Sequence, residues 1–186
     1  MNMTDNKKIL QRITFPGKIH LIQNDQQLHT VESLLNSATE FGFDTETKPS
    51  FKKGDVFKVA LLQLATDTDA YVIRLHHIKE FHLIKSIFEK EKVIKVGVAI
   101  RDDLMQLQKV FKFDAKNCFE LQTLAKNKGL KNFGIKGMTE EILEATVSKG
   151  SKMTNWENSQ LTEQQIMYAA TDAWIGLKLY KKLISI

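Results

Sequence analysis

Two apolar segments joined by a short polar turn constrain the fold of this chain most. The first segment is Phe57–Ala65, the second is Ala70–Leu75, and the turn between them begins Thr66-Asp67-Thr68. Both segments have the length and the apolar, β-branched character of strands, and the turn has the polar residues that favour chain reversal. The pattern predicts an antiparallel β-hairpin.

Strand and helix patterns alternate through the rest of the 186 residues. Further strands are expected at Lys18–Ile22, Phe41–Asp44, Lys92–Val98 and Lys116–Leu121. Helices are expected at Ile78–Glu89, Ile100–Phe111, Gln122–Lys128, Thr139–Val147 with Thr139 as its cap, and Leu161–Ile184, where Thr162 and Gln165 form a capping box. This order predicts an α/β fold with a mixed central sheet. We expect one domain over residues 1–186, with residues 1–17 as a loose or partly extended N-terminal lead-in.

Composition and charge narrow the functional class. The formal net charge is +5, a mild basic excess that is compatible with a polyanionic partner. Cys118 is the only cysteine, which excludes an internal disulfide and a cysteine-based zinc site. No signal peptide or membrane-spanning apolar run is evident, so a cytoplasmic location is expected.

Two carboxylates end the strand pattern at Phe41–Asp44. Asp44 and Glu46 are two residues apart, so on an extended chain both side chains point to the same side. Two like charges held together repel each other unless a cation lies between them. Such pairs also occur in ordinary solvated turns, so the pair predicts a metal site only if other carboxylates reach the same point.

Two more acidic positions are candidates to join them. In the helix at Ile100–Phe111, Asp103 lies roughly 50° from the centre of the apolar face and Asp102 roughly 150° away. Asp103 is therefore expected beside the core and Asp102 in solvent, although both also suit a helix dipole. In the last helix, Tyr168 and Asp172 share one face among alanines, either as part of a site or as a surface pair.

Together these segments resemble the DEDD superfamily of 3′–5′ exonucleases, in its tyrosine-containing (DEDDy) branch. The resemblance rests on Asp44-Thr45-Glu46, on Asp103 within residues 96–104, and on Tyr168-Ala169-Ala170-Thr171-Asp172-Ala173. Trp156 and the sequence Leu161-Thr162-Glu163 are typical of the group that contains the Werner syndrome helicase exonuclease domain and its stand-alone relatives. The resemblance implies an RNase H-like mixed sheet of five strands with helices on both sides.

The resemblance also implies a two-metal hydrolysis of phosphodiester bonds. Asp44, Glu46, Asp103 and Asp172 would hold two divalent cations, Mg²⁺ or Mn²⁺, and Tyr168 would orient the attacking water. Nucleoside 5′-monophosphates would leave the 3′ end of a nucleic acid. Extra C-terminal helical domains are usual in the similar ribonuclease D group, and this chain stops after its closing helix, so DNA is favoured over RNA.

Basic and aromatic side chains near these motifs are candidates for nucleic-acid binding. They are Lys52 and Lys53 after the first motif, Lys149 and Lys152 before the third, and Trp156, which is also suited to core packing. Three alternatives remain: an RNA-trimming enzyme similar to ribonuclease D, an inactive nucleic-acid-binding module, and an unrelated α/β hydrolase. The four acids and Tyr168 argue against an inactive module, and the lack of a Gly-x-Ser-x-Gly motif argues against the last.

Overall fold

A six-stranded mixed sheet forms the centre of the molecule. The computed structural model describes residues 9–48, 57–148 and 154–186. In spatial order the strands are β2 (Lys18–Ile22), β5 (Asp69–Arg74), β4 (Val59–Ala65), β3 (Glu40–Thr47), β6 (Ile94–Gly97) and β7 (Cys118–Glu120). The hairpin β4–β5 is antiparallel, β4 and β3 are antiparallel, and β3, β6 and β7 are parallel. The predicted hairpin and mixed sheet are confirmed.

The sheet has one strand more than the five that the family resemblance implies. The additional strand is β2, which pairs in parallel with β5 from Lys18↔Asp69 to Ile22↔Ile73. It covers the outer edge of the hairpin, where unpaired backbone groups would otherwise remain. The strand expected at Lys18–Ile22 is thus confirmed, and it belongs to the main sheet.

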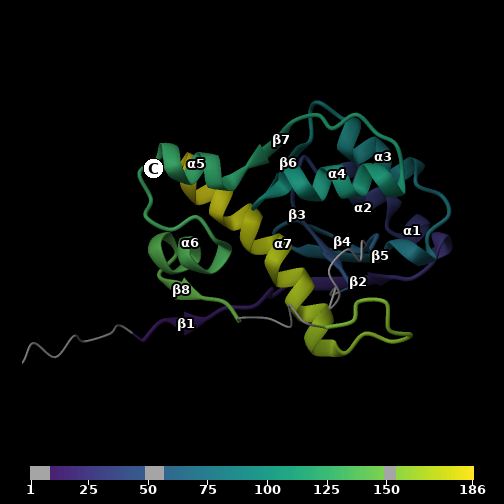
Figure 1. The fold of residues 1–186 in the computed structure, drawn as a ribbon, viewed down its shortest axis with the longest axis horizontal. Helices are drawn as coiled ribbons and strands as arrows, with labels where there is room; N and C mark the ends of the chain where they lie inside the picture. The colour runs from purple at the N-terminus through teal and green to yellow at the C-terminus, as the bar shows by residue number, and fades with distance from the viewer. Residues whose placement is uncertain (1–8, 49–56, 149–153) are drawn as a thin grey trace, which may run out of the picture.

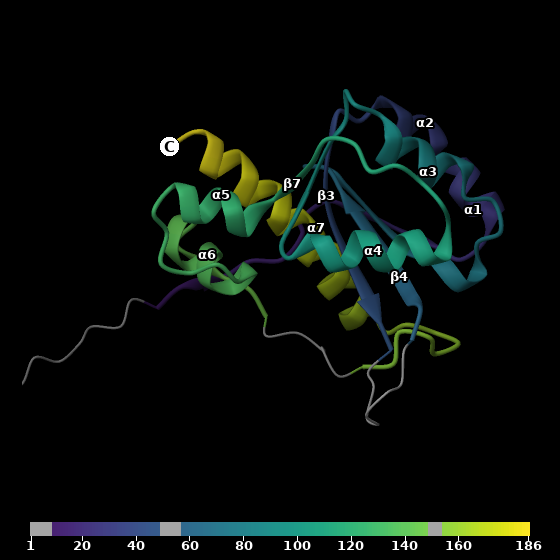
Figure 2. The ribbon, with the colours of Figure 1, turned by 45° about the horizontal axis from the view of Figure 1, so that its top comes forward.

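Helices cover both faces of this sheet (Figure 1). One face carries α1 (Asp25–Thr30), α2 (Glu32–Ser37), α3 (His82–Glu89) and α4 (Ile100–Val110), whose apolar residues form one core cluster. The other face carries α7 (Glu163–Ile184), with α5 (Leu121–Asn127) and α6 (Ile135–Ile142) packed beside it in a second cluster. Figure 2 shows α7 crossing the sheet on the face opposite to α1–α4. Within the described ranges, no helix is both long and apolar enough to cross a membrane.

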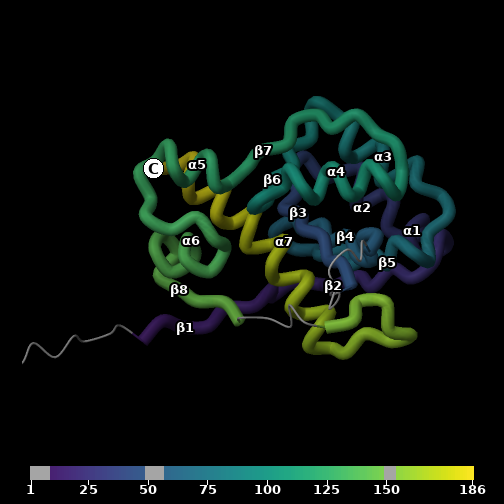
Figure 3. Tube along the Cα trace, in the orientation of Figure 1, coloured from purple at the N-terminus to yellow at the C-terminus, as the bar shows by residue number. Residues whose placement is uncertain are grey.

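The burial of strand β4 explains why its sequence is an almost continuous run of apolar residues. All seven of its residues are buried, because α7 covers one face and the α1–α4 layer covers the other. A strand buried on both faces loses the apolar–polar alternation of a half-exposed strand. The tube view in Figure 3 shows β3 and β4 lying between the two layers.

The helix expected at Thr139–Val147 is wrong in both position and cap. Helix α6 begins at Ile135, after an N-cap at Gly134, and ends at Ile142. Thr139 is buried inside it, and its hydroxyl donates a hydrogen bond of 2.6 Å to the carbonyl of Ile135 one turn earlier. A threonine can satisfy its hydroxyl in this way, so an isolated Thr is a weak helix-start signal.

Two contacts hold the described part of the N-terminal lead-in, residues 9–17, in place. Strand β1 (Gln11–Arg12) pairs in parallel with β8 (Ala145–Thr146) to form a separate two-stranded ribbon. Phe15 follows and is 2% exposed. A strand pairing and a buried aromatic ring therefore fix this part of the chain against the rest of the fold.

Candidate active site

Strand β3 presents two carboxylates at one end of the sheet. Asp44 pairs across the strands with Gln63 and Glu46 pairs with Leu61, so both side chains lie on the face that α7 covers. Thr45 lies between them and points to the other face. A register irregularity between Glu46 and Thr47 ends the regular pairing with β4 immediately after these residues.

Helix α7 lies unusually close to β3, because Gly42 has no side chain. A Cβ atom built on Gly42 would lie 1.9 Å from the carbonyl oxygen of Ala173. Asp172 precedes that contact and is 7% exposed. One oxygen each of Asp44, Glu46 and Asp172 therefore falls within 4.8 Å of the others. The structure thus brings together three of the four predicted metal ligands.

The fourth carboxylate reaches the site from the opposite face. Asp103 belongs to α4, and its Oδ1 accepts a hydrogen bond from the hydroxyl of Thr45. Asp102 is exposed to solvent, as the helical phase predicts. Asp103 is outside the group of three carboxylates but close enough for its charge to raise the pKa of Asp44.

The crowding of carboxylates perturbs their protonation. Burial raises the pKa of Asp44 well above its ordinary value, and the charges of Asp172, Asp103 and Glu46 raise it further. Burial also raises the pKa of Asp103 to about 6, although the hydrogen bond from Thr45 lowers it. Buried like charges of this kind are stable only when they are protonated or neutralised by a cation.

The chemistry of these donors fits a hard divalent cation. Every side chain in the cluster offers a carboxylate oxygen, and no histidine or cysteine belongs to it among the described residues. Oxygen-only sites suit Mg²⁺ or Mn²⁺ rather than Zn²⁺. The spacing between the oxygens leaves room for an ion to contact all three residues.

Tyr168 lies one helical turn before Asp172 on the same side of α7. Burial, the charge of Asp172 and a hydrogen bond to Asp172 all raise the pKa of Tyr168 well above its ordinary value. The phenol therefore keeps its proton near neutral pH and acts as a hydrogen-bond donor. Its ring stacks on Trp156, with the ring centroids 6.3 Å apart.

A cavity of about 420 Å³ opens over these residues. The predicted residues Asp44, Glu46, Tyr168 and Asp172 line it together with Thr45. Gly134 and Ile135, at the start of α6, also line it, and the sequence analysis did not identify them. The position of Thr45 between two acids on a strand indicates that its hydroxyl points to the opposite face of the sheet. The sequence could not identify Asp103 as its hydrogen-bond partner, because that contact depends on where α4 packs.

The predicted nucleic-acid contacts have different outcomes. Lys52, Lys53, Lys149 and Lys152 lie outside the described residues. The proposal that Trp156 stacks on a base is wrong, because its side chain is fully buried. It packs beneath Tyr168 instead, in agreement with the alternative of core packing.

Comparison with known proteins places this site in a family. Residues 19–186 match the model of the 3′–5′ exonuclease family. The chain is 32% identical over 155 residues to the bifunctional 3′–5′ exonuclease/ATP-dependent helicase WRN of Mus musculus, covering 80% of this chain and 11% of that protein. It is 33% identical over 148 residues to a 3′–5′ exonuclease of Arabidopsis thaliana, covering 76% and 51%.

A solved structure supports the same assignment. The RNase D of Escherichia coli, an exoribonuclease involved in structured RNA processing, superposes with a TM-score of 0.80 at 26% identity, covering 89% of this chain and 44% of that one. The chain spans half or less of the length of the mouse and E. coli proteins and about half of the plant protein. The match over residues 19–186 and the acidic cluster in its expected place show that this chain belongs to the 3′–5′ exonuclease family.

Proposed function

We propose that this chain is a metal-dependent 3′–5′ exonuclease that releases nucleoside 5′-monophosphates from the 3′ end of a nucleic acid. One observation carries the proposal: carboxylates from two remote segments, with an adjacent tyrosine, converge in one cavity within 4.8 Å of one another. That arrangement matches the donor set required to hold divalent cations against a phosphodiester.

The proposed ligands divide according to the face from which they come. Asp44 lies on the α7 face but is close enough to Asp103 to feel its charge, so it would contribute to holding both of two Mg²⁺ or Mn²⁺ ions. Glu46 and Asp172 would complete one ion site on the α7 face, and Asp103 would serve the second from the α4 side. Bound divalent ions would supply the positive charge that stabilises the attacking and leaving oxygens.

The other residues of the site would position the reactants. Tyr168 keeps its proton because its pKa is raised, so it would orient the attacking water by a hydrogen bond rather than act as a base. The hydroxyl of Thr45 holds the Asp103 carboxylate in place by a hydrogen bond. The cleaved strand would keep a free 3′-OH and present the next phosphate.

DNA is our proposed substrate, and RNA is the second candidate. The first rests on the resemblance of the motifs to the Werner helicase exonuclease group, which the 32% identity to WRN supports. The similarity to an exoribonuclease of known structure supports the second. Competition between 5′-labelled DNA and RNA of the same sequence, in one reaction, separates them by relative kcat/KM.

The test compares two adjacent aspartates on one helix. Asp103→Ala and Asp102→Ala remove the same charge one residue apart, but only Asp103 contacts the site. We expect a ladder of 3′-shortened products from 5′-labelled strands in Mg²⁺ or Mn²⁺. EDTA, Asp44→Ala and Asp103→Ala should abolish it, and Asp102→Ala should retain it. A ladder that survives in Asp44→Ala, or no ladder in either metal, would refute the proposal.

A further inference from the structure

A second cavity adjoins the acidic cluster on the other side of Asp172. It has a volume of about 190 Å³ and lies between the β1/β8 ribbon and the N-terminal half of α7. Tyr168 and Asp172 line both this cavity and the larger one over the carboxylates. A group bound here would therefore lie next to the reacting phosphate.

The ribbon that forms its outer wall is held firmly against α7. The backbone N–H of Ile13 donates to the carbonyl of Thr146 at 2.9 Å. The backbone N–H of Phe15 donates to the Thr171 hydroxyl at 3.0 Å, and the Phe15 ring packs edge-on against Trp174. Arg12 therefore extends from a fixed backbone, so binding a ligand would order only its side chain.

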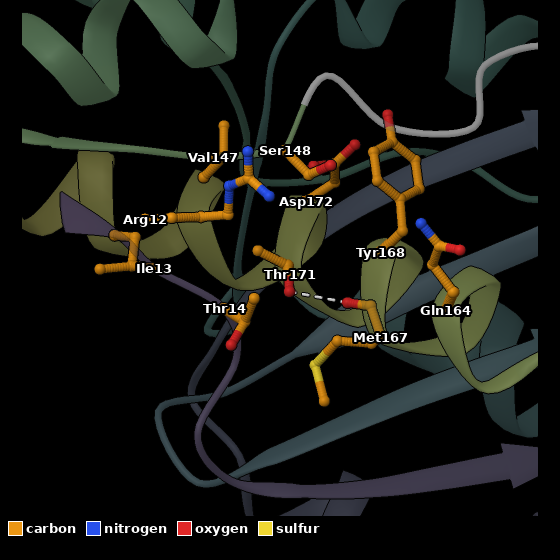
Figure 4. Close-up of a pocket in the computed structure, with 10 residues that line it drawn as sticks. All are labelled: Arg12, Ile13, Thr14, Val147, Ser148, Gln164, Met167, Tyr168, Thr171 and Asp172. Atoms are coloured by element: carbon orange, nitrogen blue, oxygen red, sulfur yellow. Dashed lines mark hydrogen bonds between the residues drawn. The ribbon is translucent and has the colours of Figure 1, made fainter. Parts of the chain in front are cut away.

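The Arg12 side chain points into this cavity. Figure 4 shows its guanidinium extending toward Asp172 and Ser148, between the ribbon and α7. A guanidinium offers a planar pair of N–H donors that match two phosphate oxygens. It is the group best suited to bind a phosphate on this side of the site, where carboxylates would otherwise repel the strand.

The remaining walls suit the rest of a nucleotide. Ile13, Val147 and Met167 contribute apolar lining to the cavity, and Gln164 contributes an amide. The volume is below the ~300 Å³ at which pockets for whole drug-sized ligands begin. The cavity would thus accept a single base or sugar, with its phosphate at Arg12.

We propose that this cavity is an additional nucleic-acid subsite, in which Arg12 binds a backbone phosphate next to the cleaved one. Ile13, Val147 and Met167 receive the base or sugar of the same nucleotide. The inference rests on the proposed exonuclease function, and it assigns the N-terminal ribbon a part in holding the strand.

The test compares Arg12 with its neighbour Gln11, which is exposed on the same strand and does not line the cavity. Steady-state kinetics on a single-stranded oligonucleotide are measured for wild type, Arg12→Ala, Arg12→Lys and Gln11→Ala at several salt concentrations. We expect Arg12→Ala to raise KM about tenfold, the loss of one charge-assisted contact, with kcat within about twofold. Its salt dependence should weaken by about one unit of slope. Arg12→Lys should recover part of the salt dependence, and Gln11→Ala should match wild type.

Two further measurements separate the possible outcomes. Inhibition by a nucleoside 5′-monophosphate should be unchanged in Arg12→Ala, because the phosphate bound is that of the strand. Weaker product inhibition with an unchanged KM would overturn the assignment, as would a fall in kcat alone. Oligonucleotide binding by Asp44→Ala, with and without Arg12→Ala, tests the contact without turnover. If no variant cleaves but Arg12→Ala still weakens oligonucleotide binding in the Asp44→Ala background, the exonuclease proposal is refuted and the subsite is supported. If Arg12→Ala leaves that binding unchanged, the subsite is refuted.

Discussion

Substituting Gly42 by alanine should separate the two halves of the acidic cluster. The new Cβ would lie 1.9 Å from the carbonyl oxygen of Ala173 and 2.9 Å from the backbone nitrogen of Leu177. Both are backbone atoms of α7, so no flexible side chain can move aside to relieve the clash. Ordinary contact begins at about 3.4 Å, so α7 and β3 must move apart by roughly 1.5 Å at this point.

A displacement of that size exceeds what the site can tolerate. Catalytic groups need to be held within about 0.5 Å of their productive positions, and an error of about 1 Å can cost a factor of about 100 in rate. Asp172 lies next to the contact and Asp44 is two residues from Gly42, so the gap opens between the ligands themselves. We expect kcat to fall at least about 100-fold, with overpacking lowering the free energy of unfolding by about 1 to 3 kcal/mol.

The assay must separate misplacement of ligands from loss of folded protein. Leu35→Ala is the control: Leu35 is 1% exposed, belongs to the core on the opposite face, and should cost about 2 to 5 kcal/mol. Urea unfolding gives the folded fraction of each variant, and kcat is corrected for it. Leu35→Ala should keep its corrected kcat. A folded Gly42→Ala protein with kcat near wild type would refute the reasoning that close approach of α7 builds the site.

Three other changes have definite expected outcomes. Burial raises the pKa of Asp103 to about 6, so its ionisation should destabilise the metal-free protein progressively from about pH 4 to 6 and by a constant amount above pH 6. Asp103→Asn should therefore be more stable than wild type by about 1 to 3 kcal/mol at pH 8 and equally stable at pH 3. Urea unfolding in EDTA measures both differences. Trp156→Leu removes the ring that stacks on Tyr168 and should lower kcat about tenfold in the wild-type background. In the Tyr168→Phe background the same substitution should cause no further loss of kcat. Additive losses in this double-mutant cycle would contradict a role of Trp156 in positioning the tyrosine. Thr162→Ala removes the hydrogen bond to the backbone of Gln165 and should lower the free energy of unfolding by about 1 kcal/mol, whereas Thr162→Ser should lower it little.

Local patterns were sufficient to predict most of the fold. The hairpin and the capping box at Thr162 depend on contacts between residues close in sequence, and the order of strand and helix patterns was enough to predict a mixed sheet; all three are present. The position of α6 was wrong for a local reason, because Thr139 satisfies its hydroxyl inside the helix, and the pairing of β1 was not predicted because it is long-range. The polar strand β1 is too short to show periodicity, and it exists because β8, more than a hundred residues later, pairs with it.

The acidic site was predictable to a similar extent and for a similar reason. Helical phase correctly separated Asp103 from Asp102, since burial depends on the position around a single helix. The pairing of Asp103 with Thr45 was not predictable, because it requires α4 and α7 to lie on opposite faces of β3. The cavity at Arg12 was missed for the same reason: three segments remote in sequence line it.

The close packing of α7 explains how the chain tolerates this concentration of negative charge. Repulsion acts at its N-terminal half, where burial and the charge of Asp172 raise the pKa of Asp44 well above its ordinary value. Its C-terminal half buries Trp174, Ile175, Leu177, Leu179, Tyr180 and Leu183. At about 1.5 to 3 kcal/mol for each large side chain, that burial contributes roughly 9 to 18 kcal/mol. Packing at the C-terminal half therefore opposes the repulsion at the N-terminal half, and a divalent cation that relieves the repulsion should stabilise the fold as well as permit catalysis.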